Sequence, residues 1–115
     1  MIHPALVSIT FRKLDPPAIV QLVKQACLVG IEWGGDIHVP HGDRARAREV
    51  RALTEEAGLT TYAYGSYYRA GHSEDEGLSF EAVCASACAL NAPTIRVWAG
   101  KQDAAELILS SRPAA

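Results

Sequence analysis

The sequence predicts an α/β protein that contains about four βα units and a parallel sheet. Short apolar segments alternate with stretches whose apolar residues recur at helical spacing, and each of these stretches begins at a capping residue. Strands that alternate with helices pair in parallel, because the chain crosses back over the sheet between them. The 115 residues, of which 49% are hydrophobic and 21% charged, are enough for one packed domain.

The first half of the chain is expected to hold two of these units. The apolar residues 5–9 predict the first strand. Asp15, which two prolines follow, predicts a helix start, and we expect this helix to stop near Gly30 because glycine favours helix ends. Residues 30–33 form the second predicted strand, and Asp43 is expected to cap the second predicted helix, residues 44–57.

The second half repeats the alternation. Residues 59–64 predict the third strand, and a polar loop that contains glycines follows it. Ser79 is a good N-cap for a helix over residues 80–90. Residues 94–98 predict the fourth strand, and residues 104–110 a last short helix.

Polar residues interrupt the apolar strands at corresponding places. Ser8, Glu32 and Arg96 each stand between two apolar residues, so alternation turns them to the face opposite the helices. Burying an unpaired charge is costly. In a (β/α)8 barrel this face is the interior, where alternate strands share a layer, so we expect Glu32 and Arg96 to form an ion pair. Such a pair serves either the core alone or a substrate.

Aromatic and polar residues also gather where the predicted strands end. Phe11, Trp33, His38, Tyr67 and Trp98 all lie in or beside these ends. Aromatic walls with a few polar groups suit a sugar, whose ring faces are apolar and whose edges carry hydroxyls. His38 is a candidate for binding a hydroxyl, for acid–base chemistry or for holding a metal, although a lone histidine in a loop is more often structural.

Composition argues against several other classes of protein. The formal net charge of −2 gives no reason to expect nucleic acid or an anionic membrane as a partner. The sequence shows neither a membrane-spanning apolar segment nor a secretory signal, so we expect a cytoplasmic protein. Three cysteines give no disulfide framework, and we expect Cys84 and Cys88 to be buried on a helix face rather than to hold a metal.

Four motifs together resemble the sugar phosphate isomerase/epimerase family, the xylose-isomerase-like barrels. They are VSITFRKL, GIEWGGDIHVPHGD, YGSYYRAG and APTIRVWAG, in order over residues 6–100. The resemblance implies a (β/α)8 barrel, a divalent metal (Mn²⁺, Mg²⁺, Co²⁺ or Zn²⁺) and movement of a proton or hydride between adjacent sugar carbons. It also implies a substrate-binding role for Phe11, Glu32, His38, Arg96 and Trp98. The related zinc-dependent apurinic endonucleases fit less well, because the fourth predicted strand ends in Trp98 rather than in histidine.

The chain departs from this family in its length. A full barrel needs about 250 residues, and the family's metal ligands come from strands five to eight. We therefore expect residues 1–102 to form the N-terminal half of such a barrel and residues 103–115 to be a divergent tail, from a truncation or a frameshift. We expect this half to bind a small sugar or sugar phosphate, to be inactive and without a cofactor when alone, and to pair with its missing half or with a second copy.

Two alternatives remain at this point. One is a non-enzymatic βα module that binds a small polyol or a protein partner. The other, less favoured, is a homodimeric barrel that uses Glu32, Asp36 and His38 as metal ligands.

Overall fold

The structure is a computed structural model and describes residues 2–70, 73 and 77–99. Strands and helices alternate along the chain. In order they are β1 (Ala5–Val7), the short 3-10 helix η1 (Ser8–Phe11), α1 (Pro16–Gln25), β2 (Gly30–Gly34), α2 (Arg44–Glu56), β3 (Thr60–Ala70), α3 (Phe80–Leu90) and β4 (Ile95–Ala99).

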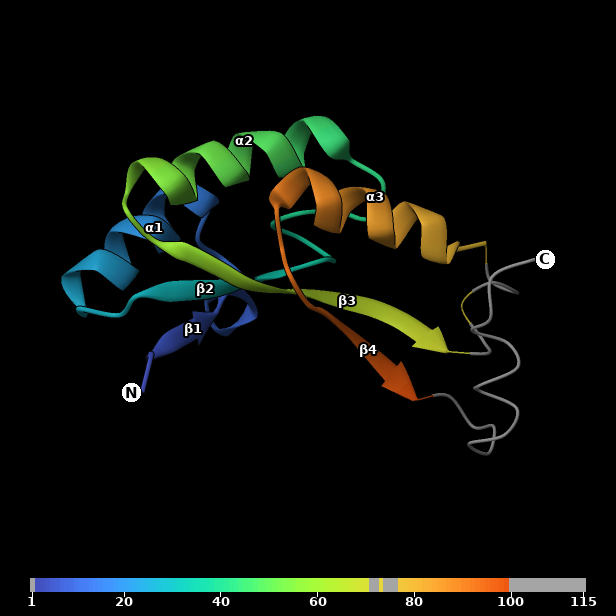
Figure 1. The fold of residues 1–115 in the computed structure, drawn as a ribbon, viewed down its shortest axis with the longest axis horizontal. Helices are drawn as coiled ribbons and strands as arrows, with labels where there is room; N and C mark the ends of the chain where they lie inside the picture. Colours follow the sequence, from blue (N-terminus) through green and yellow to red (C-terminus); the bar gives the residue numbers. More distant parts are fainter. Residues whose placement is uncertain (1, 71–72, 74–76, 100–115) are drawn as a thin grey trace.

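The strands form one sheet in the order β1-β2-β3-β4, and every neighbouring pair is parallel. Figure 1 shows α1, α2 and α3 together on one side of this sheet. Within the described part of the chain, no helix covers the other side. The predicted α/β class with a parallel sheet is confirmed, and the sequential strand order is consistent with successive units of a (β/α)8 barrel.

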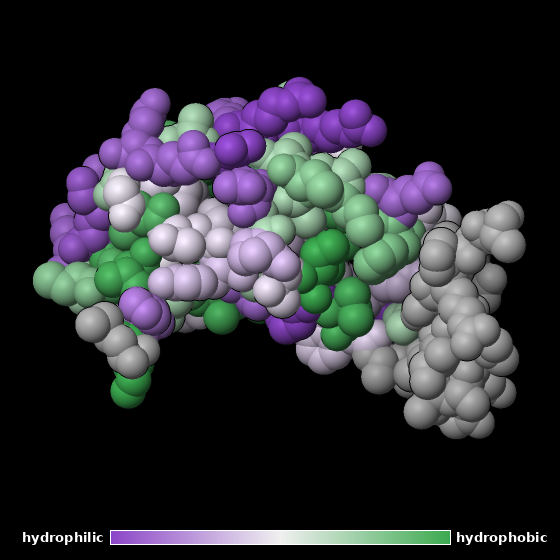
Figure 2. All heavy atoms as spheres, viewed as in Figure 1, coloured by the Kyte–Doolittle hydropathy of each residue, from purple (hydrophilic) through white to green (hydrophobic). Residues whose placement is uncertain are grey.

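The core lies between the sheet and the helices. Ile31 and Trp33 project from β2 and are fully buried, as are Ile19 of α1, Val50 of α2 and Val83 of α3. Hydrophilic residues gather over the outer surface of α2, whereas the surface over α3 is more hydrophobic (Figure 2). Burial of the apolar stripe of each helix against the sheet is the main force that holds this arrangement.

Each helix begins at the residue that the sequence predicts. The side chains of Asp15, Asp43 and Ser79 accept hydrogen bonds from the backbone N–H three residues later. Each cap satisfies one of the N–H groups that the first turn of a helix leaves without a partner. The start of each of these three helices is therefore determined by residues that are close in the sequence.

The end of α1 differs from the prediction. The helix ends at Gln25 rather than near Gly30, because Cys27 adopts a left-handed backbone conformation with φ of 60°. The N–H of Leu28 then donates to the carbonyl of Val23, which closes the helix in a Schellman arrangement. Gly30 instead belongs to β2, where a Cβ atom would lie 2.2 Å from a ring carbon of Tyr62.

Two strands also differ in length. The first predicted strand, 5–9, is shortened because η1 begins at Ser8. The third predicted strand, 59–64, continues to Ala70, so residues 65–69 lie in β3 and not in a loop. The register of β3 with β4 shifts between Gly65 and Arg69. This irregularity lets β3 continue through residues whose sequence predicts a loop.

Two cysteines on α3 are more exposed to solvent than the sequence predicts. Cys88 is exposed and Cys84 is half-buried, so the expectation that both are buried is wrong. Both lie on α3, whose outer surface no further helix covers within the described residues. The predicted helix over 104–110 and the tail over 103–115 lie outside the described residues.

No helix in residues 2–70, 73 and 77–99 has both the length and the apolar character needed to cross a membrane.

Candidate functional site

A buried polar network forms where β1 and β2 end. The hydroxyl oxygen of Ser8 accepts a hydrogen bond from the N–H of Gly34 at 2.7 Å and lies 3.0 Å from Nδ1 of His38. The other ring nitrogen of His38, Nε2, lies 2.9 Å from the carbonyl oxygen of Leu14. A carbonyl oxygen can only accept, so Nε2 carries the proton and Nδ1 accepts from the Ser8 hydroxyl.

His38 therefore holds the loop after β2 against η1. Only 2% of its surface is exposed, and both ring nitrogens have protein partners. Its ring also packs edge-on against Trp33, with 6.1 Å between the centroids. This geometry gives His38 a structural role and leaves no free ring nitrogen for a substrate or a metal.

Trp33 lies on the helix-covered side of the sheet. Its side chain is fully buried, and its indole N–H donates to the hydroxyl of Thr54 in α2 at 3.1 Å. Glu32, the preceding residue, points to the opposite side. Trp33 thus lies on the opposite side of the sheet from Glu32 and its partner Arg96.

The predicted ion pair between Glu32 and Arg96 is confirmed. Nε of Arg96 lies 3.2 Å from Oε2 of Glu32, and the two side chains are 36% and 18% exposed. The pair joins β2 to β4 across Gly65 of β3, where a Cβ atom would lie 2.9 Å from Nη2 of Arg96 and 3.1 Å from Oε2 of Glu32. Gly65 therefore leaves the space in which the two charges meet.

Two aromatic side chains beside β4 and β1 remain accessible to solvent. Trp98 of β4 is 47% exposed, and the guanidinium of Arg96 lies 5.6 Å from the centroid of its ring. Phe11, the last residue of η1, is also exposed. Cation–π contact fixes the orientation of Arg96 and leaves much of the indole open to solvent.

Arg12 connects three strands through an ion pair and a hydrogen bond. Arg12, which follows η1, pairs through Nη2 with Asp36 in the loop after β2. Its Nη1 also donates to the hydroxyl of Tyr67 in β3 at 3.3 Å. Hydrogen bonds to Asp36 and then to Tyr67 raise the pKa of Arg12 above its ordinary value, so the guanidinium stays charged.

His41 connects the same loop to β3. Its Nε2 accepts a hydrogen bond from the backbone N–H of Tyr67 at 3.2 Å, and its ring packs edge-on against Tyr64. Burial lowers the pKa of His41, and the nearby charge of Asp36 opposes this effect. Burial raises the pKa of Tyr64 to about 12, and its hydroxyl donates to the carbonyl of Val39 at 2.6 Å.

The described residues do not by themselves fit a divalent metal. In residues 2–70, 73 and 77–99, no three His, Cys, Asp or Glu side chains come together in a group that could hold one. Glu32 is paired with Arg96 and Asp36 with Arg12, and the ring nitrogens of His38 are engaged. The ligand set Glu32, Asp36 and His38 is therefore not assembled.

Arg12 and His41 are site residues that the sequence did not single out, and Asp36 was considered only as a metal ligand of the less favoured homodimeric barrel. Arg12 and Asp36 both follow predicted strands and carry opposite charges, which was the only local signal for their pairing. Nothing in the sequence indicated a role for His41, because its hydrogen-bond partner is a backbone N–H in a segment that was predicted to be a loop.

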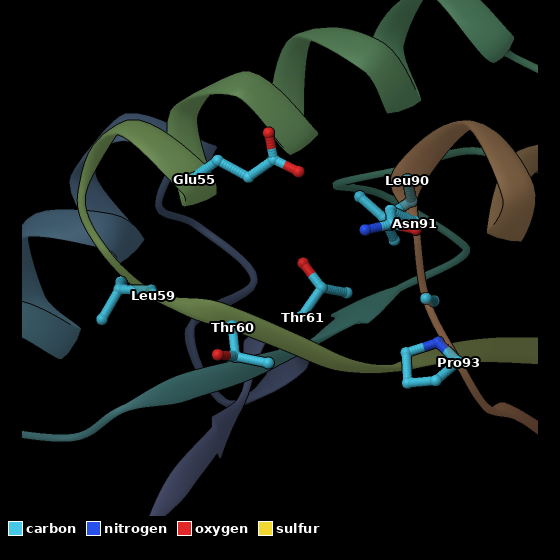
Figure 3. Close-up of a pocket in the computed structure, with 8 residues that line it drawn as sticks. Glu55, Leu59, Thr60, Thr61, Leu90, Asn91 and Pro93 are labelled. Atoms are coloured by element: carbon cyan, nitrogen blue, oxygen red, sulfur yellow. The ribbon is translucent and has the colours of Figure 1, made fainter.

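A hollow of about 390 Å³ lies at the opposite end of the sheet. Glu55 of α2 and Thr61 of β3 point towards it, and Leu90, Asn91 and Pro93 close its other side (Figure 3). It adjoins the amino ends of β3 and β4, whereas ligands of parallel α/β sheets bind at the carboxyl ends of the strands. Arg12, Asp36 and Trp98 lie at or just beyond those carboxyl ends, and with the Glu32–Arg96 pair, which lies within β2 and β4, they form the candidate site.

No model of a known protein family matches this chain, and no curated protein sequence matches it.

Proposed function

We propose that this chain is the substrate-binding N-terminal part of a metal-dependent sugar or sugar phosphate isomerase or epimerase, and that it is inactive alone. One observation carries the proposal. The Arg12–Asp36 ion pair, Phe11 and Trp98 lie at or just beyond the carboxyl ends of β2, β1 and β4. The Glu32–Arg96 pair lies within β2 and β4, on the sheet face that no described helix covers. Enzymes built on parallel barrels place their active sites at this end.

The chemistry of these groups suits a polyhydroxylated ligand. Sugar hydroxyls both donate and accept hydrogen bonds, so they can bridge the carboxylate of Glu32 and the guanidinium of Arg96. The open face of Trp98 offers an apolar surface for a sugar ring. Phe11 and Tyr67 extend this polar and aromatic surface towards β1 and β3.

The catalytic metal, Mn²⁺, Mg²⁺, Co²⁺ or Zn²⁺ in this proposal, is held by residues other than those described. When bound, it would polarise the carbonyl and hydroxyl oxygens of the sugar. The residues of this chain bind and orient the ligand. We also propose a cytoplasmic location, which the three free thiols support because a reducing compartment preserves them.

An alternative function is that of a non-enzymatic module that binds a small polyol or a protein. The exposure of Val7 on β1 and of Val97 and Trp98 on β4 favours it. These strands are the two edges of the described sheet, and their unpaired backbone groups invite a further strand. A second copy of the chain or the complementary barrel half would cover the same edges.

Ligand binding can be tested through tryptophan fluorescence. The chain has two tryptophans, and Trp33 is buried while Trp98 is 47% exposed. A sugar that stacks on the site is expected to change the emission of Trp98. Titration with D-fructose and with D-fructose 6-phosphate reports this change, and the Trp98→Phe variant, which keeps Trp33, is the matched control.

Activity and oligomeric state test the remaining parts of the proposal. The proposal expects sugar binding without turnover when Mn²⁺ is added to the chain alone. No emission change with either sugar would refute the polyol site in both functions. Sugar turnover by the isolated chain would refute the claim that it is inactive alone, and light scattering across micromolar concentrations tests self-association.

A further inference from the structure

We propose that Arg12 recognises an anionic group on the ligand, and that Asp36 occupies its guanidinium until a phosphate or carboxylate replaces it. The inference rests on the proposed function and narrows its substrate class to phosphorylated or carboxylated sugars. Three residues carry it: Arg12, Asp36 and Tyr67.

These residues converge from the carboxyl ends of three neighbouring strands. Arg12 follows β1 through η1, Asp36 follows β2, and Tyr67 lies in the second half of β3. The guanidinium pairs with the carboxylate of Asp36 and donates to the hydroxyl of Tyr67. The guanidinium of Arg12 thus lies just beyond the carboxyl ends of β1 and β2, beside β3.

The guanidinium is both accessible and suited to a larger anion. The side chain of Arg12 is 51% exposed, and a guanidinium offers five N–H donors in a planar fork that matches carboxylate or phosphate oxygens. The carboxylate of Asp36 already occupies the position of such an anion. The side chain of Asp36 is 25% exposed, and ion pairs of this exposure contribute little to stability, so an anion of higher charge can compete with the carboxylate for the guanidinium.

The guanidinium of Arg96 is less available than that of Arg12. Nε of Arg96 is held by Glu32, whose side chain is only 18% exposed, and its guanidinium lies over the ring of Trp98. Displacing Glu32 would leave a partly buried carboxylate without its partner, which is costly. Arg96 therefore remains paired, and Arg12 is the cation that can change partner.

The decisive experiment compares two variants whose effects have opposite signs. Affinities for D-fructose, D-fructose 6-phosphate and inorganic phosphate are measured by calorimetry on the full chain. Arg12→Gln is expected to weaken binding of the two phosphate compounds about tenfold or more, because a charge-assisted hydrogen bond is lost, and to weaken binding of D-fructose, which carries no anionic group, by a much smaller factor. Asp36→Asn is expected to strengthen binding of the same two compounds, because it removes the competing carboxylate.

The control variant is Arg51→Gln. Arg51 forms an exposed ion pair with Glu55 on α2, similar in kind to the Arg12–Asp36 pair but on a helix. This variant should leave all three affinities unchanged. Arg12→Lys keeps the charge without the planar fork and should give an intermediate affinity.

The outcomes separate this inference from the proposed function. If D-fructose and its phosphate bind equally, or if Asp36→Asn weakens phosphate binding, the inference fails and the polyol site stands. If neither sugar binds, the proposed function fails, while phosphate binding that disappears in Arg12→Gln still supports the anion role. Circular dichroism of each variant shows whether it is folded.

Discussion

The ion pair between Glu32 and Arg96 should couple β2 to β4 energetically. At 3.2 Å between Nε and Oε2, and with an effective dielectric constant of about 20, Coulomb attraction is about 5 kcal/mol. Exposed fractions of 18% and 36% mean that desolvation and solvent screening offset most of this attraction. We expect a net coupling free energy of about 1–2 kcal/mol.

A double-mutant cycle measures this coupling. The variants Glu32→Gln, Arg96→Gln and the double variant are unfolded in urea and followed by circular dichroism at 222 nm. The free-energy losses of the two single variants should add up to more than the loss of the double variant, because each single variant leaves the other charge without a partner. The coupling should decrease in about 1 M salt, although less than for a fully exposed pair.

The matched control is the cycle between Arg51 and Glu55. These side chains are 43% and 55% exposed and lie one turn apart on α2, so about 0.3–0.5 kcal/mol is expected there. If the coupling of Glu32 and Arg96 does not exceed that of the control pair, the reasoning from partial burial is wrong.

Three further predictions concern a close contact in the sheet, a hydrogen bond in the core and the titration of His41. Gly30→Ala should lower the free energy of unfolding by about 2 kcal/mol or more, because the added Cβ would lie 2.2 Å from the ring of Tyr62; an unchanged urea midpoint would contradict this. Thr54→Val should cost about 1–3 kcal/mol, because the buried indole N–H of Trp33 loses its acceptor, and a red shift of tryptophan emission would accompany any opening of the core. Burial lowers the pKa of His41 below its ordinary 6.5, so the unfolded chain takes up this proton first as the pH falls. Stability should be unaffected by His41 above pH 6.5 and should decline below it towards the lower pKa of the folded state, and in His41→Gln this decline should be smaller.

Local signals determined the helices and their starts. Asp15, Asp43 and Ser79 cap the three helices as expected, because a cap needs only a short polar side chain and an N–H three residues away. Alternation along β2 and β4 was enough to place Glu32 and Arg96 on the same face. The sequence alone therefore predicted the α/β class, the parallel sheet and this ion pair.

The tertiary structure decided the features that depend on distant contacts. The length of β3 depends on pairing with β4, so the glycine and tyrosines of residues 65–69 read as a loop until that partner is in place. Burial of His38 follows from Ser8, 30 residues earlier in the chain. Arg12 meets Asp36 and Tyr67 at separations of 24 and 55 residues. Periodicity and capping act over a few residues, whereas a site at the carboxyl ends of parallel strands is assembled only when the sheet brings those ends together.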